Sequence, residues 1–298
     1  MSRRGKRRRA NQAAVWFALP SLCGVTLFLM LPLAEMIQRS FYTAMTEGYV
    51  EISNYRAVFQ DEAFHLACRN TLRFVAVCLP LLIGLGLLIA VCLARFSAVR
   101  FVKTLFLLPM AIPGASLVLV WKMAFAGGGF LNGFLTWASG VWGSGTVYRA
   151  DHMGSKTAFY VLVFSYVWKN LGYTVVLWLA GILSVPVAIK EAARMDGAGR
   201  VKCFLFIELP NLKPVLYTIT VLSFLNSFKV FREAYLVAGS YPDESIYLLQ
   251  HLFNNWFVNL EYDRMAAAAV IMGGTLFAFI WLLQRIWEKE GVGGSHEK

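Results

Sequence analysis

Residues 191–210 read E-A-A-R-M-D-G-A-G-R-V-K-C-F-L-F-I-E-L-P and lie between two long apolar segments, 157–183 and 214–230. Apolar windows of about 18 residues or more are typical of membrane-spanning helices. The quoted stretch is therefore predicted to be a polar loop between two spans. A structured, charged loop in such a hydrophobic protein indicates a place where a soluble partner binds.

Apolar segments of this length recur along the whole chain. Hydrophobic residues make up 58% of the sequence and charged residues 15%, whereas a soluble domain carries about a quarter charged residues. Open strands would leave unpaired backbone groups in hydrocarbon, so each span should be a helix. We predict an all-α polytopic membrane protein with six transmembrane helices, at about 13–36, 74–93, 104–122, 157–183, 214–237 and 265–287.

The positions of lysine and arginine predict how these spans are oriented. They gather in the two termini and in the loops 94–103 and 184–214, whereas the opposite loops hold only Arg39, Arg56, Arg69, Arg149, Lys156 and Arg264. Because basic residues concentrate on cytoplasmic loops, both termini should face the cytoplasm. The net charge of +11 then reflects topology rather than nucleic-acid binding.

The sequence predicts four segments. A basic cytoplasmic tail covers 1–12; the first span and an outer segment cover 13–63; five helices with the loop 184–214 cover 64–287; and a second tail covers 288–298. The first span is predicted to be a retained anchor, because its apolar run is too long for a signal peptide and no A-x-A site follows. On the outer side we expect short helices near 54–66 and 246–258.

No residue pattern predicts catalysis, a metal or a cofactor. The five cysteines lie in or beside spans or in the loop 184–214, without a C-x-x-C pair, and the four histidines have no ligand spacing. H-E-x-x-H, G-x-S-x-G and G-x-x-x-x-G-K-[ST] are absent, and residues 154–157, G-S-K-T, are only a near miss. We therefore predict that the chain is not an enzyme and binds no nucleotide itself.

The loop 184–214 contains its own helix signals. Ser184 is a candidate N-cap, Pro186 suits the first helical position, and Gly197 suits the position just past the helix end. A second short helix is expected at about 200–206. Ala188, Ala192 and Met195 share one face of the first helix, which favours insertion into a groove of another protein. A helix resting on lipid is the alternative.

The loop sequence resembles the cytoplasmic EAA loop of inner-membrane permeases of binding-protein-dependent ABC importers. The resemblance is carried by Glu191-Ala192-Ala193, Asp196-Gly197-Ala198, Phe204, Ile207, Leu209-Pro210 and Pro214, with further similarity at Leu107-Leu108-Pro109, 129–132 and Val167-Trp168-Lys169. The D-G-A version is similar to the carbohydrate-uptake branch, and the end of span five is similar to the first permease of a pair, the maltose and glycerol-3-phosphate permease-like type. That type usually has Gly-Gly-Pro where this chain has Gly239-Ser240-Tyr241-Pro242.

The resemblance implies a type I importer permease fold, a location in the bacterial plasma (inner) membrane, and a set of partners. These are a second, homologous permease, a dimer of cytoplasmic ATP-binding subunits and an extracytoplasmic binding protein that delivers a sugar or polyol. It also implies that ATP is bound by the partner subunit. The loop would couple this chain to the ATPase through Glu191, Ala192, Ala193, Arg194, Asp196, Gly197, Ile207 and Pro210.

Several polar residues fall inside predicted spans, where charges cost roughly 2.5–3.5 kcal/mol each. A sugar path would need amide and hydroxyl groups, and the candidates are Asn170, Tyr173, Asn226, Ser227 and Lys229. Hydrogen bonds between helices are the alternative for these side chains. Lys229 and Glu233 stand four residues apart and could neutralise each other, and Arg232 and Glu233 could reach the headgroups. A secondary transporter or channel is the rival function, although paired intramembrane carboxylates are missing.

Overall fold

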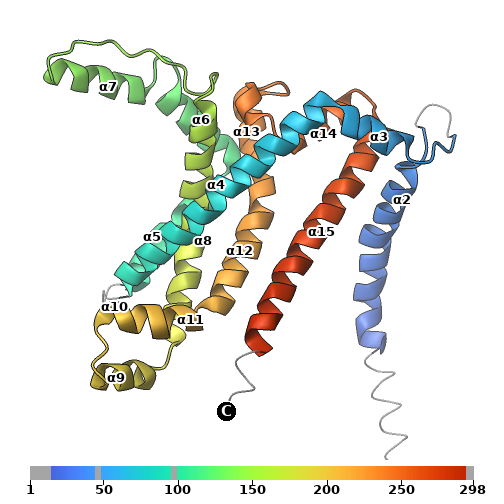
Figure 1. The fold of residues 1–298 in the computed structure, drawn as a ribbon. Helices are drawn as coiled ribbons and strands as arrows, with labels where there is room; N and C mark the ends of the chain where they lie inside the picture. Colours follow the sequence, from blue (N-terminus) through green and yellow to red (C-terminus); the bar gives the residue numbers. More distant parts are fainter. Residues whose placement is uncertain (1–14, 44–47, 95–98, 293–298) are drawn as a thin grey trace, which may run out of the picture. The chain divides into compact units, whose positions relative to one another are not determined.

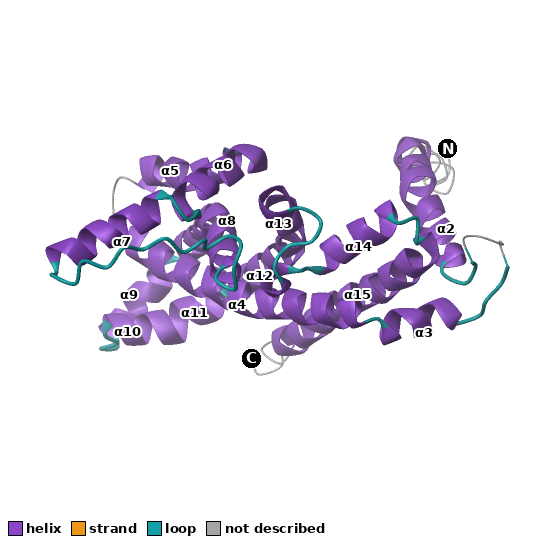
Figure 2. Cartoon of the chain, turned by 90° about the horizontal axis from the view of Figure 1, so that it is seen from above, coloured by secondary structure: helices purple, strands orange, loops and turns teal. Residues whose placement is uncertain are grey.

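The computed structural model describes residues 15–43, 48–94 and 99–292. Every regular element in this part of the chain is a helix (Figure 2), as the apolar spans predict, and strand-like pairing is limited to a bridge between Tyr42 and Tyr49. The predicted tail 1–12 lies outside the described residues.

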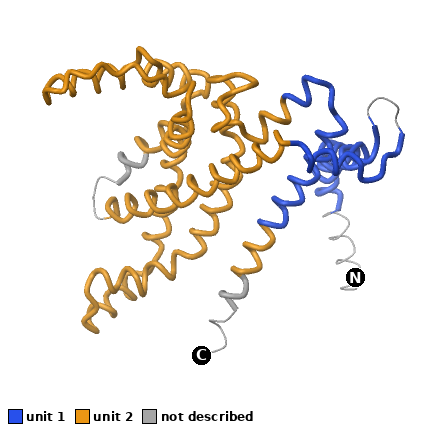
Figure 3. Tube along the Cα trace, turned by 45° about the horizontal axis from the view of Figure 1, so that its top comes forward, with its two compact units in different colours: residues 1–61, 255–279 blue, residues 62–254, 280–298 orange. Residues whose placement is uncertain are grey.

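The chain forms two compact units, 1–61 with 255–279, and 62–254 with 280–298 (Figure 3). The first unit holds a helix at Val15–Arg39, whose last part is α2 (Leu31–Arg39), together with α3 (Ser53–Gln60) and the beginning of α15 (Tyr262–Val292). The amide of Asn54 donates to the carbonyls of Ser40 and Tyr42, both at 3.0 Å, and so holds the turn after α2 against α3.

Five helices are long and apolar enough to cross a membrane, and a sixth span is reached if α8 (Ala158–Ser184) and α9 (Val187–Met195) are taken together. The second span is longer than predicted, because α4 runs from Glu62 to Leu93. The predicted helix at 54–66 is wrong as a single element. The backbone is extended at Asp61, between the end of α3 and the start of α4.

The third span also differs from the prediction of one helix at 104–122. It is divided into α5 (Val99–Ala111) and α6 (Gly114–Phe125), and the backbone at Pro113 is extended, with ψ of 139°. Proline lacks an N–H donor and disfavours a helical residue before it, so the helix ends near Ile112. The apolar stretch then continues into α7 (Phe130–Val141), an element that the sequence did not predict.

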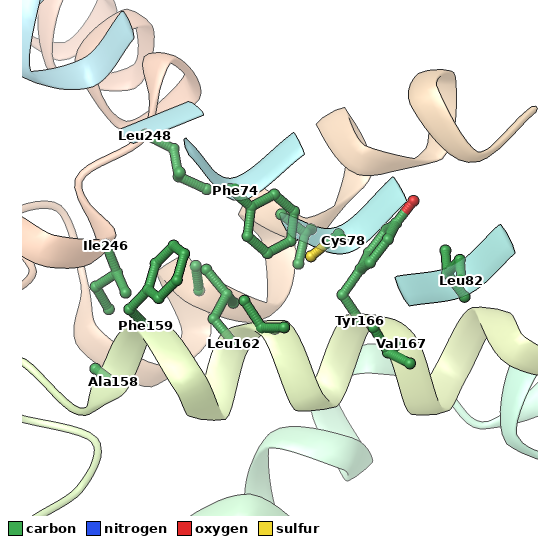
Figure 4. Close-up of a cluster of buried hydrophobic side chains, with 13 residues drawn as sticks. Phe74, Cys78, Leu82, Ala158, Phe159, Leu162, Tyr166, Val167, Ile246 and Leu248 are labelled. Carbon is green, nitrogen blue, oxygen red and sulfur yellow. The ribbon is translucent and has the colours of Figure 1, made fainter. Parts of the chain in front are cut away.

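The centre of the second unit is the contact between α4 and α8. Side chains of the two helices interdigitate (Figure 4), and the rings of Phe74 and Tyr166 meet edge to face at 5.3 Å. Ile246 and Leu248 close this core from a later loop. The buried members drawn and labelled in the figure are Phe74, Cys78, Leu82, Ala158, Phe159, Leu162, Tyr166, Val167, Ile246 and Leu248.

A second contact brings α5 against α8 at Gly172. A Cβ atom at this position would lie 1.8 Å from the carbonyl oxygen of Phe106, so only glycine allows the two backbones to approach this closely. Nearby, Trp178 and Leu179 pack against Ile219 of α12 (Lys213–Ser227). Helices α4, α5 and α12 therefore all pack against α8.

Beyond α12, a 3-10 turn (Phe228–Val230) and α13 (Phe231–Ala238) lead to a loop with a 3-10 turn at Glu244–Ile246 and then α14 (Leu249–Val258). The predicted helix at 246–258 is confirmed in its later part. Asn70 of α4 donates to the carbonyls of Glu244 and Tyr247, and the Thr71 hydroxyl accepts from the Leu249 N–H. These bonds fix the loop to α4.

Candidate coupling loop and membrane cavity

The loop with the E-A-A sequence forms a compact helical elbow. It consists of α9, α10 (Arg200–Cys203), a π-helical turn (Phe204–Glu208) and α11 (Leu209–Asn211), which leads into α12. The two predicted helices are thus present, and the second is longer than expected. Figure 1 shows α9 at one end of α8 and α12, with α13 at the other end.

The start of α9 corrects one prediction. Ser184 does not cap this helix, because it is the last residue of α8 and its hydroxyl donates to the Gly181 carbonyl at 2.7 Å. The cap position is instead Pro186, with ψ of 133°. Residues before proline avoid the helical region, so Val185 is extended, α8 ends at Ser184, and the chain turns by 65° into α9.

The end of α9 is fixed by Gly197, as predicted. The Gly197 N–H donates to the carbonyl of Arg194, and the Ala198 N–H donates to that of Ala193 at 2.9 Å. These two bonds form a Schellman motif, which requires a left-handed residue after the cap. Gly197 has φ of +81°, where a residue with a Cβ is strained.

The exposure of α9 distinguishes the candidate coupling residues. Ala193 is buried, with 8% of its surface exposed, and faces the rest of the chain. Met195 is 88% exposed and Val187 66% exposed, so α9 presents an uncovered apolar surface. Among the other candidates, Ile207 is half-buried, and the exposed ones are Glu191, Ala192, Arg194, Asp196, Gly197 and Pro210.

Lys190 links α9 to the rest of the elbow, a role that the sequence analysis missed. Its ammonium group lies 3.3 Å from a carboxylate oxygen of Glu208 and donates to the carbonyl of Ile182 at 3.2 Å. The side chain therefore joins α9 to the π-helical turn and to the end of α8. Lys190 and Glu208 line a cavity of about 430 Å³, and Arg194 and Arg200 line it as well. Because Lys190 and Glu208 are far apart in the sequence, no spacing could have predicted their contact.

A second cavity of about 150 Å³ lies between α5, α8 and the α12–α13 segment. Three of the five predicted path residues line it: Asn170, Asn226 and Lys229. The other two do not. The Tyr173 hydroxyl is 2.7 Å from the Ser223 hydroxyl, and the Ser227 hydroxyl donates to a carbonyl of its own helix.

The charges around this cavity pair differently from the sequence expectation. Glu233 forms an ion pair with Lys169 of α8, and Lys229 donates to the Asn226 side-chain oxygen at 2.9 Å. The expected Lys229–Glu233 pair is wrong because the 3-10 turn Phe228–Val230 changes the helical register between them. Glu233 is also buried, with 7% of its surface exposed, so it does not reach the headgroups.

No group of three histidine, cysteine or acidic side chains arranged to hold a metal occurs in the part of the chain that the structure describes. At the two sites the structure shows an exposed apolar helix joined to α8 and a cavity lined by amide and charged groups.

Residues 82–289 match a known protein family, described as "Binding-protein-dependent transport system inner membrane component". The chain belongs to this family. It is therefore a membrane permease of a transport system that depends on a binding protein, and the expected ABC permease class is confirmed. The matched region contains both the elbow and the membrane cavity.

Curated relatives match over nearly the whole chain. The sn-glycerol-3-phosphate transport system permease protein UgpA of Yersinia pestis bv. Antiqua (strain Antiqua) is 29% identical over 268 residues, covering 85% of this chain and 86% of the relative. The probable ABC transporter permease protein YesP of Bacillus subtilis (strain 168) is 28% identical over 300 residues, covering 94% and 93%.

Solved structures confirm the permease fold. A chain of a bacterial ABC transporter involved in import of the acidic polysaccharide alginate superimposes with a TM-score of 0.81 at 19% identity, covering 97% of this chain and 99% of that chain. A chain from the alginate transporter in complex with an alginate pentasaccharide-bound periplasmic protein gives a TM-score of 0.79 at 19% identity, covering 96% and 97%.

Proposed function

We propose that this permease carries a sugar or related polyol across the inner membrane in an importer driven by ATP hydrolysis on a separate subunit. The single observation that carries the proposal is the elbow: a helix fixed at its start by Pro186 and at its end by Gly197, with an exposed apolar face. The sugar class is supported by the relatives, whose names include glycerol-3-phosphate and alginate transport.

The elbow would bind a cleft of the ATPase by the helix-in-groove mode. Met195, Ala192 and Glu191 are on the exposed surface of α9, whereas Ala193 packs inward and sets the position of the helix. The Lys190 contacts with Glu208 and Ile182 join α9 to α8. Movement of the ATPase would therefore rotate α9 and the end of α8 as one body, and ATP itself would remain on the partner subunit.

The membrane cavity would be one half of the solute path. Its lining combines amide and charged groups, and the side chain of Lys229 is exposed. A second permease subunit facing this surface would complete the path. An extracytoplasmic binding protein would deliver the solute at the end of the unit that carries α13, opposite the elbow.

Co-purification and transport test this function together. A tagged chain should recover an ATPase, a second permease and, with a binding protein added, ATP-dependent uptake in proteoliposomes. Glu191→Lys should abolish uptake by placing a cation on the docking face. Lys202→Glu is the matched control. It changes the charge by the same amount on the exposed surface of α10, and it should retain uptake. Solute uptake driven by an ion gradient without any ATPase would instead support a secondary transporter.

A further inference from the structure

The charges that line the membrane cavity do not balance. Lys169 is neutralised by its ion pair with Glu233, and both side chains are largely buried, with 24% and 10% of their surfaces exposed. Lys229 is the remaining charged group of the lining, and its contact is with the neutral amide of Asn226. Within the described residues Lys229 has no acidic partner, so the cavity carries one uncompensated positive charge.

The groups that meet at this charge are the Lys229 ammonium group and the Asn226 amide. Lysine has three N–H donors and no acceptor, so its contact with Asn226 uses the side-chain oxygen of that amide. The amide then has its NH₂ group left to bind a solute. The neighbouring Asn170 amide already donates to the Tyr166 carbonyl at 2.8 Å. Lys229 and the Asn226 NH₂ group thus place N–H donors next to each other in the cavity lining.

A set of donors around a cation is complementary to an acceptor that carries negative charge. A carboxylate or phosphate oxygen accepts several such bonds at once, and charge-assisted bonds are roughly twice as strong as neutral ones. A neutral sugar hydroxyl would leave the lysine charge uncompensated. Intramembrane charges are costly and usually face a ligand path or a partner.

Resting on the proposed function, we infer that the transported solute is an anion, a sugar acid or a sugar or polyol phosphate, and that Lys229 and Asn226 bind its carboxylate or phosphate group. Lys169 is not the cation that binds the solute, because its charge is already neutralised by the ion pair with Glu233. This assignment makes Lys229 a specificity-determining residue for negatively charged solutes.

The first arm of the test identifies the solute. The binding protein that co-purifies with the importer, kept loaded with its natural ligand, is analysed by native mass spectrometry, which also separates a carboxylate from a phosphate. The expected ligand carries one of these groups. A neutral sugar that the importer moves in an ATP-dependent way would overturn the inference and leave the proposed function standing. ATP-independent uptake, or none, would defeat both.

The second arm measures uptake of the identified solute in proteoliposomes containing the complete importer. Lys229→Gln should lower uptake at least tenfold, Lys229→Arg should retain most of it, and Lys122→Gln, which removes an exposed lysine of α6 outside the cavity, should leave it unchanged. Unaltered uptake in Lys229→Gln would overturn the assignment. So would loss of the second permease from the purified Lys229→Gln complex, because Lys229 would then pair with that subunit.

Discussion

For the ion pair between Lys169 and Glu233, removing one partner should lower the free energy of unfolding much more than removing both. The pair joins α8 to α13 and is mostly buried, so removing either partner leaves an uncompensated charge in a low-dielectric site. Breaking such a pair costs about 3–5 kcal/mol, whereas replacing both charges by apolar residues is often neutral or stabilising. We therefore expect Glu233→Leu to lower the free energy of unfolding by about 3–5 kcal/mol, and Lys169→Met with Glu233→Leu to restore most of it.

The chain offers a matched control for this measurement. Glu35 and Arg39 form an ion pair of 2.8 Å, but their side chains are 61–62% exposed, and exposed pairs contribute about 0–1 kcal/mol. Reversible unfolding in mixed detergent and SDS, followed by tryptophan fluorescence, would give a double-mutant cycle for each pair. If Glu233→Leu cost no more than Glu35→Leu, or if the double variant were no more stable than Glu233→Leu, the reasoning would be refuted.

Three further predictions concern the elbow and the outer loop. Gly197→Ala should destabilise the elbow by roughly 1–2 kcal/mol, because alanine is strained at a positive φ, and should reduce ATP-coupled uptake; Gly199→Ala, at an ordinary φ, should have little effect. Lys190→Met should leave the ATPase bound but lower the number of solutes moved per ATP, because α9 loses its link to α8; equal coupling in wild type and variant would contradict this role. His251 is buried between Phe231 and Tyr247, and burial lowers its pKa from 6.5 to about 4. The folded state therefore prefers the neutral ring, so stability is complete above pH 6.5 and is lost by up to about 3 kcal/mol as the pH falls toward 4. His251→Phe should flatten this pH dependence in thermal unfolding of the complex, and an unchanged acid profile would show that the ring is not its source.

Much of the fold could be predicted because it depends on local signals. Apolar windows located the spans, and Gly197 marked the end of α9 since its conformation is set by a few neighbouring residues. Pro113 lies within the predicted third span, but the sequence alone did not show that it would divide the helix into α5 and α6. The helix α7 was not predicted; it follows three glycines at 127–129, and glycine has a low helix propensity.

The candidate sites were predicted in part, for a different reason. The helix period placed Ala192 on the exposed face of α9, and the intramembrane polar residues included three that line the cavity. The pairing of Lys169 with Glu233 joins residues 64 positions apart, and that of Lys190 with Glu208 joins two helices of the elbow. Such contacts depend on how helices pack, and a single sequence contains no periodic signal for them.

Site-directed cross-linking tests most directly whether α9 binds the ATPase. Cysteine would be introduced at Met195, which is exposed, and at Ala193, which is buried, and each variant would be purified with its partner chains. We predict a cross-link from position 195 to the ATP-binding subunit and none from position 193. If the cysteine at position 195 never cross-links to an ATPase, or is labelled only by reagents added outside the cell, α9 is not the helix that binds the ATPase.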